Sequence, residues 1–413
     1  MESYFTHNFF AGNRKRLYES MSQDGLCVVG AHGILQRSRD TTFPFAQDKN
    51  FWYLTGLDMP DAVLVMAGNR EYLILPKRSR EQDIFDGAFD LKHVAARSGL
   101  HELLDNTEGW RQLRADVKRY EVVSTLFSEP SYDRRHGVYV NPARNRLIGR
   151  LRRLQSGIAL ADIRPNLAEL RMIKQPAEIA AVSQAVAITT RAIDAMRSSA
   201  VLAGFATEYE FEAALSQSFR AQGARGHAYD PIVASGSNAT TLHYIANSAQ
   251  LAAGQLIVVD VGAEVEEYAA DITRTVACEQ PTHRQQTVLA AVRDVQQYAL
   301  TLLKPGVLLQ EYEKKVGQKM ATALVELGLI SDATDTMSMR NYFPHATSHF
   351  LGLDVHDVGF YDRPLAAGVV LTCEPGIYIA EEGIGVRLED DVLITESGHT
   401  NLSRDCSYDA YVI

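Results

Sequence analysis

Two aspartates lie within an otherwise apolar hairpin pattern, and their spacing is the first sign of chemistry in this chain. Residues 255–277 (QLIVVDVGAEVEEYAADITRTVA) read as two β-strands joined by a short turn. If the strands pair symmetrically about Val265-Glu266, Asp260 stands directly opposite Asp271, with Cβ atoms roughly 5 Å apart. Two carboxylates buried at that distance require a shared proton or a cation. A solvated hairpin face is the alternative.

A cluster of histidines follows in the segment PHATSHFLGLDVHDVG, where His345, His349 and His356 fall within 12 positions. The spacing is not that of a HExxH zinc helix, because no glutamate follows His345. Taken alone, the segment is compatible with a structural loop that carries one functional histidine.

Two glutamates complete the set of candidate ligands. Glu374 ends an apolar run immediately before Pro-Gly, and Glu389 shares a face with Arg387 and Asp391 by the two-residue alternation of a strand. Taken singly, each glutamate has an ordinary interpretation. Glu374 could be a turn residue, and Glu389 could belong to a surface strand with salt bridges.

The combined donor set is four carboxylates with one or more histidines and no cysteine. Oxygen-rich ligation with a single imidazole suits Mn²⁺ or Co²⁺ better than a thiolate zinc site. Because four carboxylates exceed the charge of one divalent ion, two ions bridged by shared carboxylates are the natural count. Paired ions about 3.5–4 Å apart are typical of hydrolases.

Composition limits the class of protein that must position these residues. The chain has 413 residues, 46% of them apolar and 22% charged, which excludes disordered, collagen-like and coiled-coil chains. The net charge of −10 argues against nucleic acid or an anionic membrane as partner. No apolar run approaches the ~18–20 residues of a membrane span. The four scattered cysteines and the lack of a signal peptide favour a reduced, cytoplasmic enzyme.

The chain divides into two predicted domains, residues 1–165 and 166–413, with Pro165 marking the boundary. The first reads as mixed α/β, with strands at 61–68 and 71–76 joined at Gly68-Asn69. In the second, an order of two helices followed by strands occurs twice, which predicts a pseudo-symmetric repeat. Its predicted helices are 176–199, from 207 onward, 288–302 and 310–327, and its later strands are 369–372, 377–380 and 386–395.

In this order and in these contexts, the candidate ligands resemble those of the pita-bread metallopeptidases, and within that group the bacterial aminopeptidase P (Xaa-Pro aminopeptidase) family. The contexts are VVDVGAEVEEYAADITRTV, HATSHFLGLDVHDVG, LTCEPGIYI and GVRLEDDVLIT. The segment RDTTFPFAQDKNFWYLTGLDMPDAVLV resembles that family's non-catalytic domain, and LRMIKQPAEIAAV resembles the start of its catalytic domain.

The resemblance implies an α/β (α+β) fold, in which a creatinase-like mixed α/β domain precedes a pita-bread domain with a pseudo-twofold axis and a curved antiparallel sheet. It implies two divalent metal ions, Mn²⁺ first, with Co²⁺ or Zn²⁺ as alternatives. A hydroxide between the ions would attack the Xaa–Pro bond of a peptide. The five implied metal ligands are Asp260, Asp271, His349, Glu374 and Glu389, with Asp271 and Glu389 bridging.

The resemblance also implies roles for residues around the metals. Glu374 would take and pass on the proton, His356 would stabilise the oxyanion, and His243 would lie near the scissile amide. The remaining matches are His345, which would line the proline side, and the pocket residues Tyr229, Tyr378 and Arg387.

Two alternative functions remain within the resemblance. A prolidase would cleave only Xaa-Pro dipeptides, with Arg363 as the candidate partner for the dipeptide carboxylate. A non-catalytic pita-bread protein would only bind peptides. The expected partners are small peptides with proline second and copies of the chain itself, as a homodimer or homotetramer, without nucleic acid or membrane.

Overall fold

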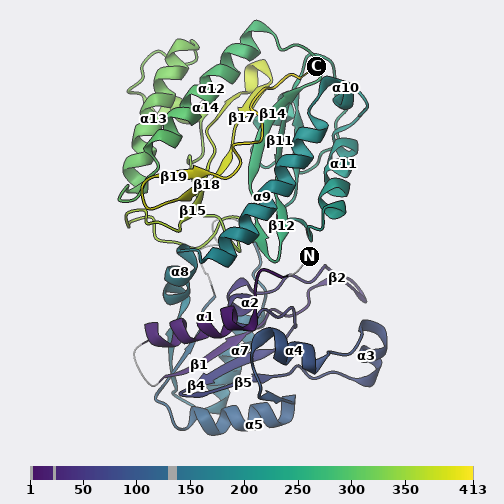
Figure 1. Cartoon of the computed structure of the whole chain (residues 1–413), viewed down its shortest axis with the longest axis vertical. Coiled ribbons are helices and arrows are strands. Elements are labelled where there is room, and N and C mark those ends of the chain that lie inside the picture. The colour runs from purple at the N-terminus through teal and green to yellow at the C-terminus, as the bar shows by residue number, and fades with distance from the viewer. Residues whose placement is uncertain (1–2, 22–24, 129–136, 413) are drawn as a thin grey trace. The chain divides into compact units, whose positions relative to one another are not determined.

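The computed structural model describes residues 3–21, 25–128 and 137–412, and the chain divides into two compact units (Figure 1). One unit is Phe5–Leu170, and the other is Arg171–Ile413 with Met1–Tyr4. Helix α8 (Arg164–Met172) spans the division along the chain.

The first unit is built on a mixed six-stranded sheet with strand order β6-β5-β4-β1-β7-β8. As predicted, β4 and β5 form a tight hairpin in which Ala67 pairs with Arg70 and Gly68 adopts a positive φ of 62°. The elements of this unit are α1 (His7–Ser20), β1 (Leu26–Gly30), β2 (Gln36–Ser38), β3 (Thr41–Thr42), α2 (Lys49–Thr55), β4 (Val63–Ala67), β5 (Arg70–Ile74), α3 (Arg80–Asp86), α4 (Leu91–Ser98), β6 (Leu103–Leu104), α5 (Asn106–Val117), β7 (Val122–Thr125), α7 (Ala143–Leu154) and β8 (Ala159–Asp162).

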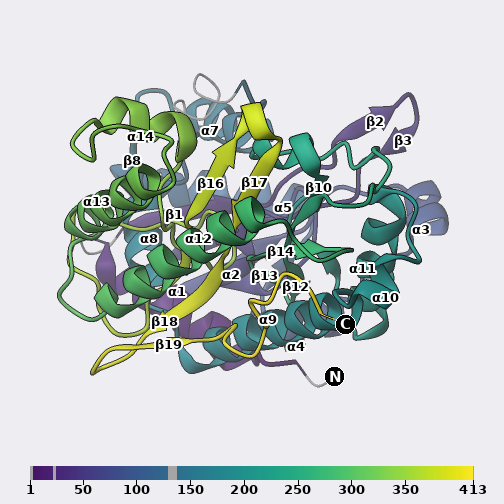
Figure 2. The ribbon, with the colours of Figure 1, turned by 90° about the horizontal axis from the view of Figure 1, so that it is seen from above.

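The second unit contains short antiparallel sheets covered by long helices (Figure 2). Its helices are α9 (Pro176–Met196), α10 (Ser199–Leu202), α11 (Glu208–Ala221), η1 (Gly236–Thr240), α12 (His283–Leu302), α13 (Leu309–Glu326), α14 (Thr336–Tyr342) and η2 (Ala380–Glu382). Its strands are β9 (Gly226–His227), β10 (Ile232–Ser235), β11 (Leu256–Val261), β12 (Ala263–Val265), β13 (Tyr268–Ala269), β14 (Ile272–Ala277), β15 (Val370–Cys373), β16 (Gly376–Ile379), β17 (Ile384–Arg387), β18 (Asp390–Ile394) and β19 (His399–Asn401).

The long helices of the second unit form where their periodicity predicts them. Pro176 occupies the start of α9, and Gln175 and Glu178 complete a capping box there. The apolar faces of α12 and α13 pack with β15–β18 in one hydrophobic cluster, and α9 packs along β12–β14. The order of two helices followed by strands therefore occurs twice, with the strands of both halves lying beneath the helices.

The predicted register of the aspartate hairpin is wrong by two residues. In the structure Asp260 pairs with Thr273, and the turn lies at Glu266-Glu267, both of which have positive φ. A two-residue hairpin turn needs positive φ at its central residues, which a β-branched residue such as Val265 resists, so the turn moves one residue along the chain.

The predicted strand 386–395 is also wrong, because it forms two strands. Strand β17 pairs with β16, whereas β18 pairs with β15 and β19, and Leu388-Glu389 lies between them. The chain changes sheets at that point, which period-two alternation does not reveal.

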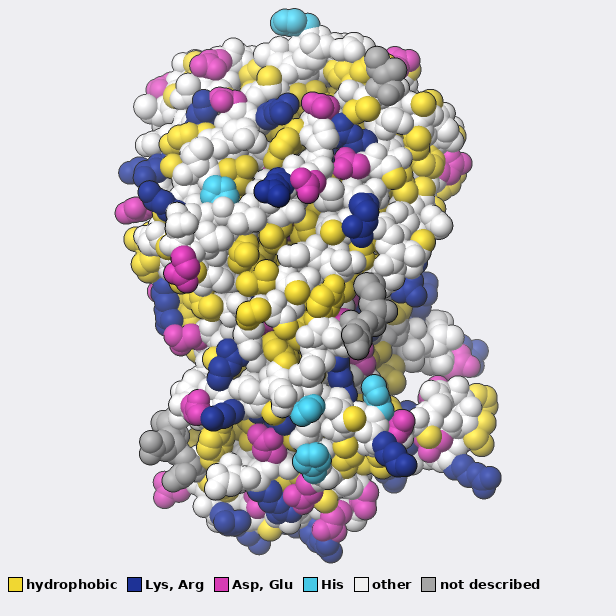
Figure 3. Space-filling model, viewed as in Figure 1, with side chains coloured by type: hydrophobic (Ala, Val, Ile, Leu, Met, Phe, Trp, Pro, Cys, Tyr) yellow, Lys and Arg dark blue, Asp and Glu magenta, His cyan; other side chains and the backbone are white. Residues whose placement is uncertain are grey.

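The surface carries mixed charges on the face that Figure 3 shows, where Lys and Arg side chains alternate with Asp and Glu in each unit. Within the described part of the chain, no helix has the length and apolar character needed to cross a membrane.

Candidate metal centre

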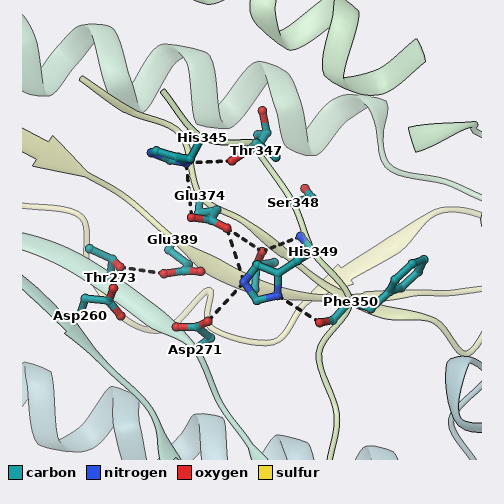
Figure 4. Close-up of polar contacts among 12 residues, drawn as sticks. Asp260, Asp271, Thr273, His345, Thr347, Ser348, His349, Phe350, Glu374 and Glu389 are labelled. Atoms are coloured by element: carbon teal, nitrogen blue, oxygen red, sulfur yellow. Dashed lines mark hydrogen bonds and ion pairs between the residues drawn. The ribbon is translucent and has the colours of Figure 1, made fainter. Parts of the chain in front are cut away.

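Five predicted ligands converge in the second unit (Figure 4). Asp260 lies in β11, Asp271 directly precedes β14, Glu374 follows β15, Glu389 lies between β17 and β18, and His349 lies on the segment before β15. The His349 Nε2 atom is 3.4 Å from Asp271 Oδ2 and 3.4 Å from Glu374 Oε1. Every one of these side chains is buried or half-buried.

A close approach between strands brings the two aspartates together despite the shifted register. A Cβ atom on Gly262, which directly follows β11, would lie 1.7 Å from the carbonyl oxygen of Ala270, which directly follows β13, so only glycine fits at position 262. The Tyr229 hydroxyl lies 2.5 Å from Asp260 Oδ1 and 2.6 Å from Asp271 Oδ1. The expectation that both carboxylates share one side of the sheet is therefore confirmed.

His349 is oriented by a backbone carbonyl. Its Nδ1 atom lies 3.0 Å from the Phe350 oxygen, so Nδ1–H donates to that carbonyl and Nε2 faces Asp271 and Glu374. Ligating histidines in metal sites usually have such a partner. This contact fixes the ring in the orientation that metal binding requires.

Burial and mutual repulsion raise the pKa values of the clustered carboxyl groups. Burial, followed by the charges of Asp271 and Glu374, raises the pKa of Glu389 well above its usual value. Burial, together with the charges of Asp271 and Asp260, raises the pKa of Glu374 to about 7. Burial also raises the pKa of Asp271. Arg387 and His349 offset only part of this negative charge, so the cluster favours either protons or metal cations.

The donor set fits a divalent cation. Ligand atoms of Asp271, His349 and Glu389 all lie within 4.8 Å of one another. Asp391, which accepts a hydrogen bond from the Asp271 backbone N–H at 3.0 Å, has a second buried oxygen without a hydrogen-bond partner among the described residues. Carboxylate oxygens with one neutral imidazole are the ligands that Mn²⁺ and related ions prefer.

The raised pKa values predict how the metal-free protein responds to pH. Because the folded pKa of Glu374 lies above its usual 4.5, the metal-free fold is most stable when this group is protonated and loses stability as pH rises through about 7. Burial lowers the pKa of His349, but the hydrogen bond to Asp271 and the charges of Glu374 and Asp271 together outweigh burial and raise this pKa to about 9. His349 therefore also makes the metal-free fold less stable as pH rises. We expect the Tm of metal-free protein to fall by several degrees between about pH 5 and pH 8.

Calorimetry with and without Mn²⁺ checks this expectation. Metal binding needs deprotonated ligands, so the difference in Tm between loaded and metal-free protein should grow as pH rises. A metal-free Tm that rises over this interval would contradict the electrostatic description of the cluster.

A second chain of hydrogen bonds borders the carboxylates. Arg387 donates from Nη1 to the Tyr378 oxygen at 3.0 Å, and the Tyr378 hydroxyl lies 2.8 Å from His345 Nε2. His345 Nδ1 lies 2.8 Å from the Ala346 oxygen. Burial, with the charge of Arg387, lowers the pKa of His345 to about 3. His345 is therefore a neutral imidazole beside Glu374.

The other predicted site residues lie at varied distances from the cluster. The His356 ring centroid is 4.3 Å from that of His349. His243 is exposed, on the segment between η1 and β11. Arg363 is exposed, with its guanidinium 4.0 Å from the Phe360 ring centroid. The structure brings Tyr229, Tyr378 and Arg387 into direct contact with the cluster or its neighbours.

Several supporting residues are missed by sequence reasoning. Thr273 donates to Glu389 Oε2 at 2.7 Å and accepts from Arg387 Nε at 3.1 Å. Glu313 on α13 accepts hydrogen bonds from the backbone N–H groups of Thr347 and Ser348, at 3.0 and 3.1 Å, and so holds the histidine segment. The alternation of ITRT could have signalled that Thr273 faces the site, but no signal distinguishes Glu313 from a surface glutamate.

Comparisons with known proteins agree with this geometry. The family model described as metallopeptidase family M24 matches residues 180–396, and that of the aminopeptidase P N-terminal domain matches residues 10–125. The Xaa-Pro aminopeptidase of Escherichia coli (strain K12) is 34% identical, with 95% of this chain and 94% of that protein covered.

Solved structures of aminopeptidase P are also similar to this chain. Aminopeptidase P from E. coli with the inhibitor Pro-Leu superposes with a TM-score of 0.85 at 31% identity, covering 98% of this chain and 97% of the other. Zinc-substituted E. coli aminopeptidase P in complex with product gives 0.84 at 32% identity, with the same coverage. The predicted fold, an N-terminal mixed α/β domain followed by a pita-bread domain, is confirmed.

Proposed function

The chain belongs to metallopeptidase family M24, and from this premise we propose that it is an Xaa-Pro aminopeptidase. Such an enzyme hydrolyses the bond between the first residue of a peptide and a proline in second position, and it releases the first residue. The observation that carries the proposal is the convergence of four carboxylates and an oriented imidazole in one buried cluster. The names of the relatives favour this function over the prolidase alternative.

The cofactor that we propose is a pair of divalent ions, Mn²⁺ foremost. Asp260, Asp271, His349, Glu374 and Glu389 would hold them, with Asp271 and Glu389 shared. When bound, the ions would supply Lewis acidity that polarises the scissile carbonyl and lowers the pKa of the attacking water. A zinc-substituted structure of the E. coli relative supports a divalent-metal site in this fold.

Glu374 would move the proton of the reaction. Burial raises the pKa of this carboxyl group to about 7 in the metal-free chain, which supports a role in proton transfer near neutral pH. In its ionised form it would accept a proton from the attacking water and then deliver that proton to the departing proline nitrogen. The pKa of the neighbouring His345 is lowered to about 3, so this imidazole is a weak base. Glu374 would therefore be the group that accepts the proton.

The proline side of the substrate requires recognition without an N–H donor. The amide before proline carries no hydrogen, so the enzyme must read the shape of the ring. His345, fixed by Tyr378 and Arg387, presents a rigid imidazole wall for this purpose, and His243 would approach from the exposed side. The N-terminal part, residues 1–165, would be non-catalytic, and the enzyme would act in the cytoplasm as a homodimer or homotetramer.

His356 would donate to the developing oxyanion, which gives a testable prediction. We expect His356→Ala to lower kcat roughly 10²-fold, as loss of one oxyanion donor does, while the metals stay bound. Steady-state kinetics with metal analysis checks this, and His283→Ala, at the exposed start of α12, is the matched control. A rise in KM with unchanged kcat would instead assign His356 to substrate binding.

A paired peptide assay tests the proposed function. The Mn²⁺-loaded enzyme is offered Ala-Pro and Ala-Pro-Ala-Ala in separate reactions, and released alanine is measured. Cleavage of the longer peptide is the expected result. Cleavage of the dipeptide alone would make the protein a prolidase. If the metal-loaded protein cleaves neither peptide, a peptide-binding protein would be favoured.

A further inference from the structure

Glu208, the first residue of α11, is buried and accepts five hydrogen bonds from the last residue of β10 and the segment that follows it. Its Oε1 atom accepts from the backbone N–H of Ser235 at 2.8 Å, the Ser235 hydroxyl at 2.7 Å and Asn238 Nδ2 at 3.1 Å. Its Oε2 atom accepts from the Tyr244 hydroxyl at 2.8 Å and the Ala249 N–H at 2.9 Å. A carboxylate offers about four lone-pair sites, so this one is saturated.

Saturation keeps Glu208 ionised. Burial raises the pKa of the carboxyl, but the hydrogen bonds from Ser235 and Ala249 more than offset burial, and the pKa lies below its usual value. Hydrogen bonds to a charged acceptor are stronger than neutral ones. The carboxylate therefore holds both ends of the segment 235–249 and, through Tyr244, its middle.

The segment that Glu208 holds carries His243, immediately before Tyr244. A second anchor lies beyond it, where Asn247 accepts from the Val233 N–H at 2.9 Å and donates to the Pro231 oxygen at 2.8 Å. Residues on either side of His243 are thus fixed, while the His243 side chain is exposed. Because residues 241–246 form no helix or strand, these side-chain contacts must supply the order that regular structure would otherwise provide.

The same segment is packed against the strand that carries Arg387. A Cβ atom on Gly385 in β17 would lie 2.1 Å from the backbone oxygen of Ala239 in η1, so the two backbones are in direct contact. The segment that carries His243 is therefore packed against β17, the strand in which Arg387 lies.

We propose that Glu208 is a positioning residue for the reaction, which holds the His243 segment so that this imidazole is aligned for substrate before binding. The proposal rests on the proposed function, in which His243 approaches the scissile amide. The hydrogen bonds that the Glu208 carboxylate accepts from the described residues come from Ser235, Asn238, Tyr244 and Ala249, so Glu208 would act through Tyr244 and the backbone. Preorganisation of this kind matters because a misplacement of about 1 Å can cost about 10²-fold in rate.

A double-mutant cycle tests the proposal. We expect Glu208→Gln to lower kcat/KM for Ala-Pro-Ala-Ala about 10²-fold with bound metal unchanged. In a His243→Ala background, the same substitution should cause no loss beyond about twofold, because the group that it positions is already absent. If instead the two losses multiply, or if the single variant loses its metals, Glu208 does not act through His243 and the proposal is overturned.

A milder variant covers the case in which Glu208→Gln fails to fold. Tyr244→Phe keeps the ring that packs on Ile232, Ala234 and Val258 and removes only the hydroxyl. It should lower kcat/KM about tenfold, the effect of one lost hydrogen bond to a charged acceptor, and only while His243 is present. Tyr209→Phe, an exposed tyrosine on α11, is the matched control. Full activity of Tyr244→Phe would overturn the proposal.

An NMR measurement separates this inference from the proposed function. With labelled histidines, the His243 imidazole should give one sharp signal in the wild-type protein and a broadened signal in Tyr244→Phe, whether or not the peptide is a substrate. An unchanged signal would overturn the positioning role. If wild-type protein fails to cleave Ala-Pro-Ala-Ala, the proposed function fails, and the NMR result alone decides whether Glu208 orders His243.

Discussion

Replacing Asp271 by alanine should abolish both activity and metal binding while leaving a folded chain. Asp271 lies at the centre of the cluster, 3.4 Å from His349 Nε2 and 2.6 Å from the Tyr229 hydroxyl. We expect kcat/KM to fall about 10³-fold or more, because the Lewis acidity that the site loses is worth several kcal/mol. Peptide assays and metal analysis on the purified variant measure both effects.

The stability of this variant distinguishes lost chemistry from lost structure. Burial raises the pKa of Asp271, so this carboxyl opposes folding of the metal-free chain at neutral pH, and its removal relieves that cost. The metal-free variant should therefore melt no lower than metal-free wild type. Asp332→Ala, at an exposed aspartate on the same unit, is the control. A fully active, metal-replete Asp271→Ala protein would contradict the assignment of the centre.

The second large effect is expected for Glu374→Gln. The amide keeps the size of the side chain and an oxygen that can face the metals, but it cannot accept the proton of the attacking water. We expect kcat to fall about 10³-fold, within the range for loss of a general base, with a much smaller change in KM. Rapid-quench or steady-state kinetics on metal-loaded enzyme measures the loss.

Glu382→Gln is a suitable control for this experiment. Glu382 lies in η2, the short turn between β16 and β17, and pairs with Arg284 on the surface, 2.7 Å between Nη2 and Oε1. Its amide variant should keep full activity. If Glu374→Gln also keeps its kcat, the proton is carried by another group and the proposed role of Glu374 is wrong.

The set of five proposed metal ligands was predicted from its resemblance to the pita-bread metallopeptidases, and local sequence pattern accounts for the placing of three of them. Asp260 and Asp271 flank a hairpin turn, and Glu374 precedes Pro-Gly at a strand end, so local periodicity and turn residues place them. The register error did not separate the aspartates, because a two-residue shift in an antiparallel pair keeps side chains on the same face.

The residues that hold the two histidine-bearing segments were not predictable in the same way. Glu208 lies in the first turn of α11, where glutamate is ordinary because it complements the helix dipole. Glu313 lies one turn into the amphipathic helix α13, where a glutamate is ordinary for solubility. The hydrogen-bond partners of Glu208 lie 27 to 41 positions away along the chain, and those of Glu313 lie 34 to 35 positions away. Local sequence pattern does not reveal such distant partners. The break at Leu388-Glu389 likewise depends on which sheet each strand joins, and that is decided by tertiary packing.

The most direct test of the account counts bound ions and measures cleavage in the same samples. Metal-free enzyme is titrated with Mn²⁺, and alanine released from Ala-Pro-Ala-Ala is followed together with the number of ions bound per chain. The account predicts no cleavage without metal and full activity only when two ions are bound. Full activity in the metal-free protein, or at a single bound ion, would contradict the proposed dinuclear centre.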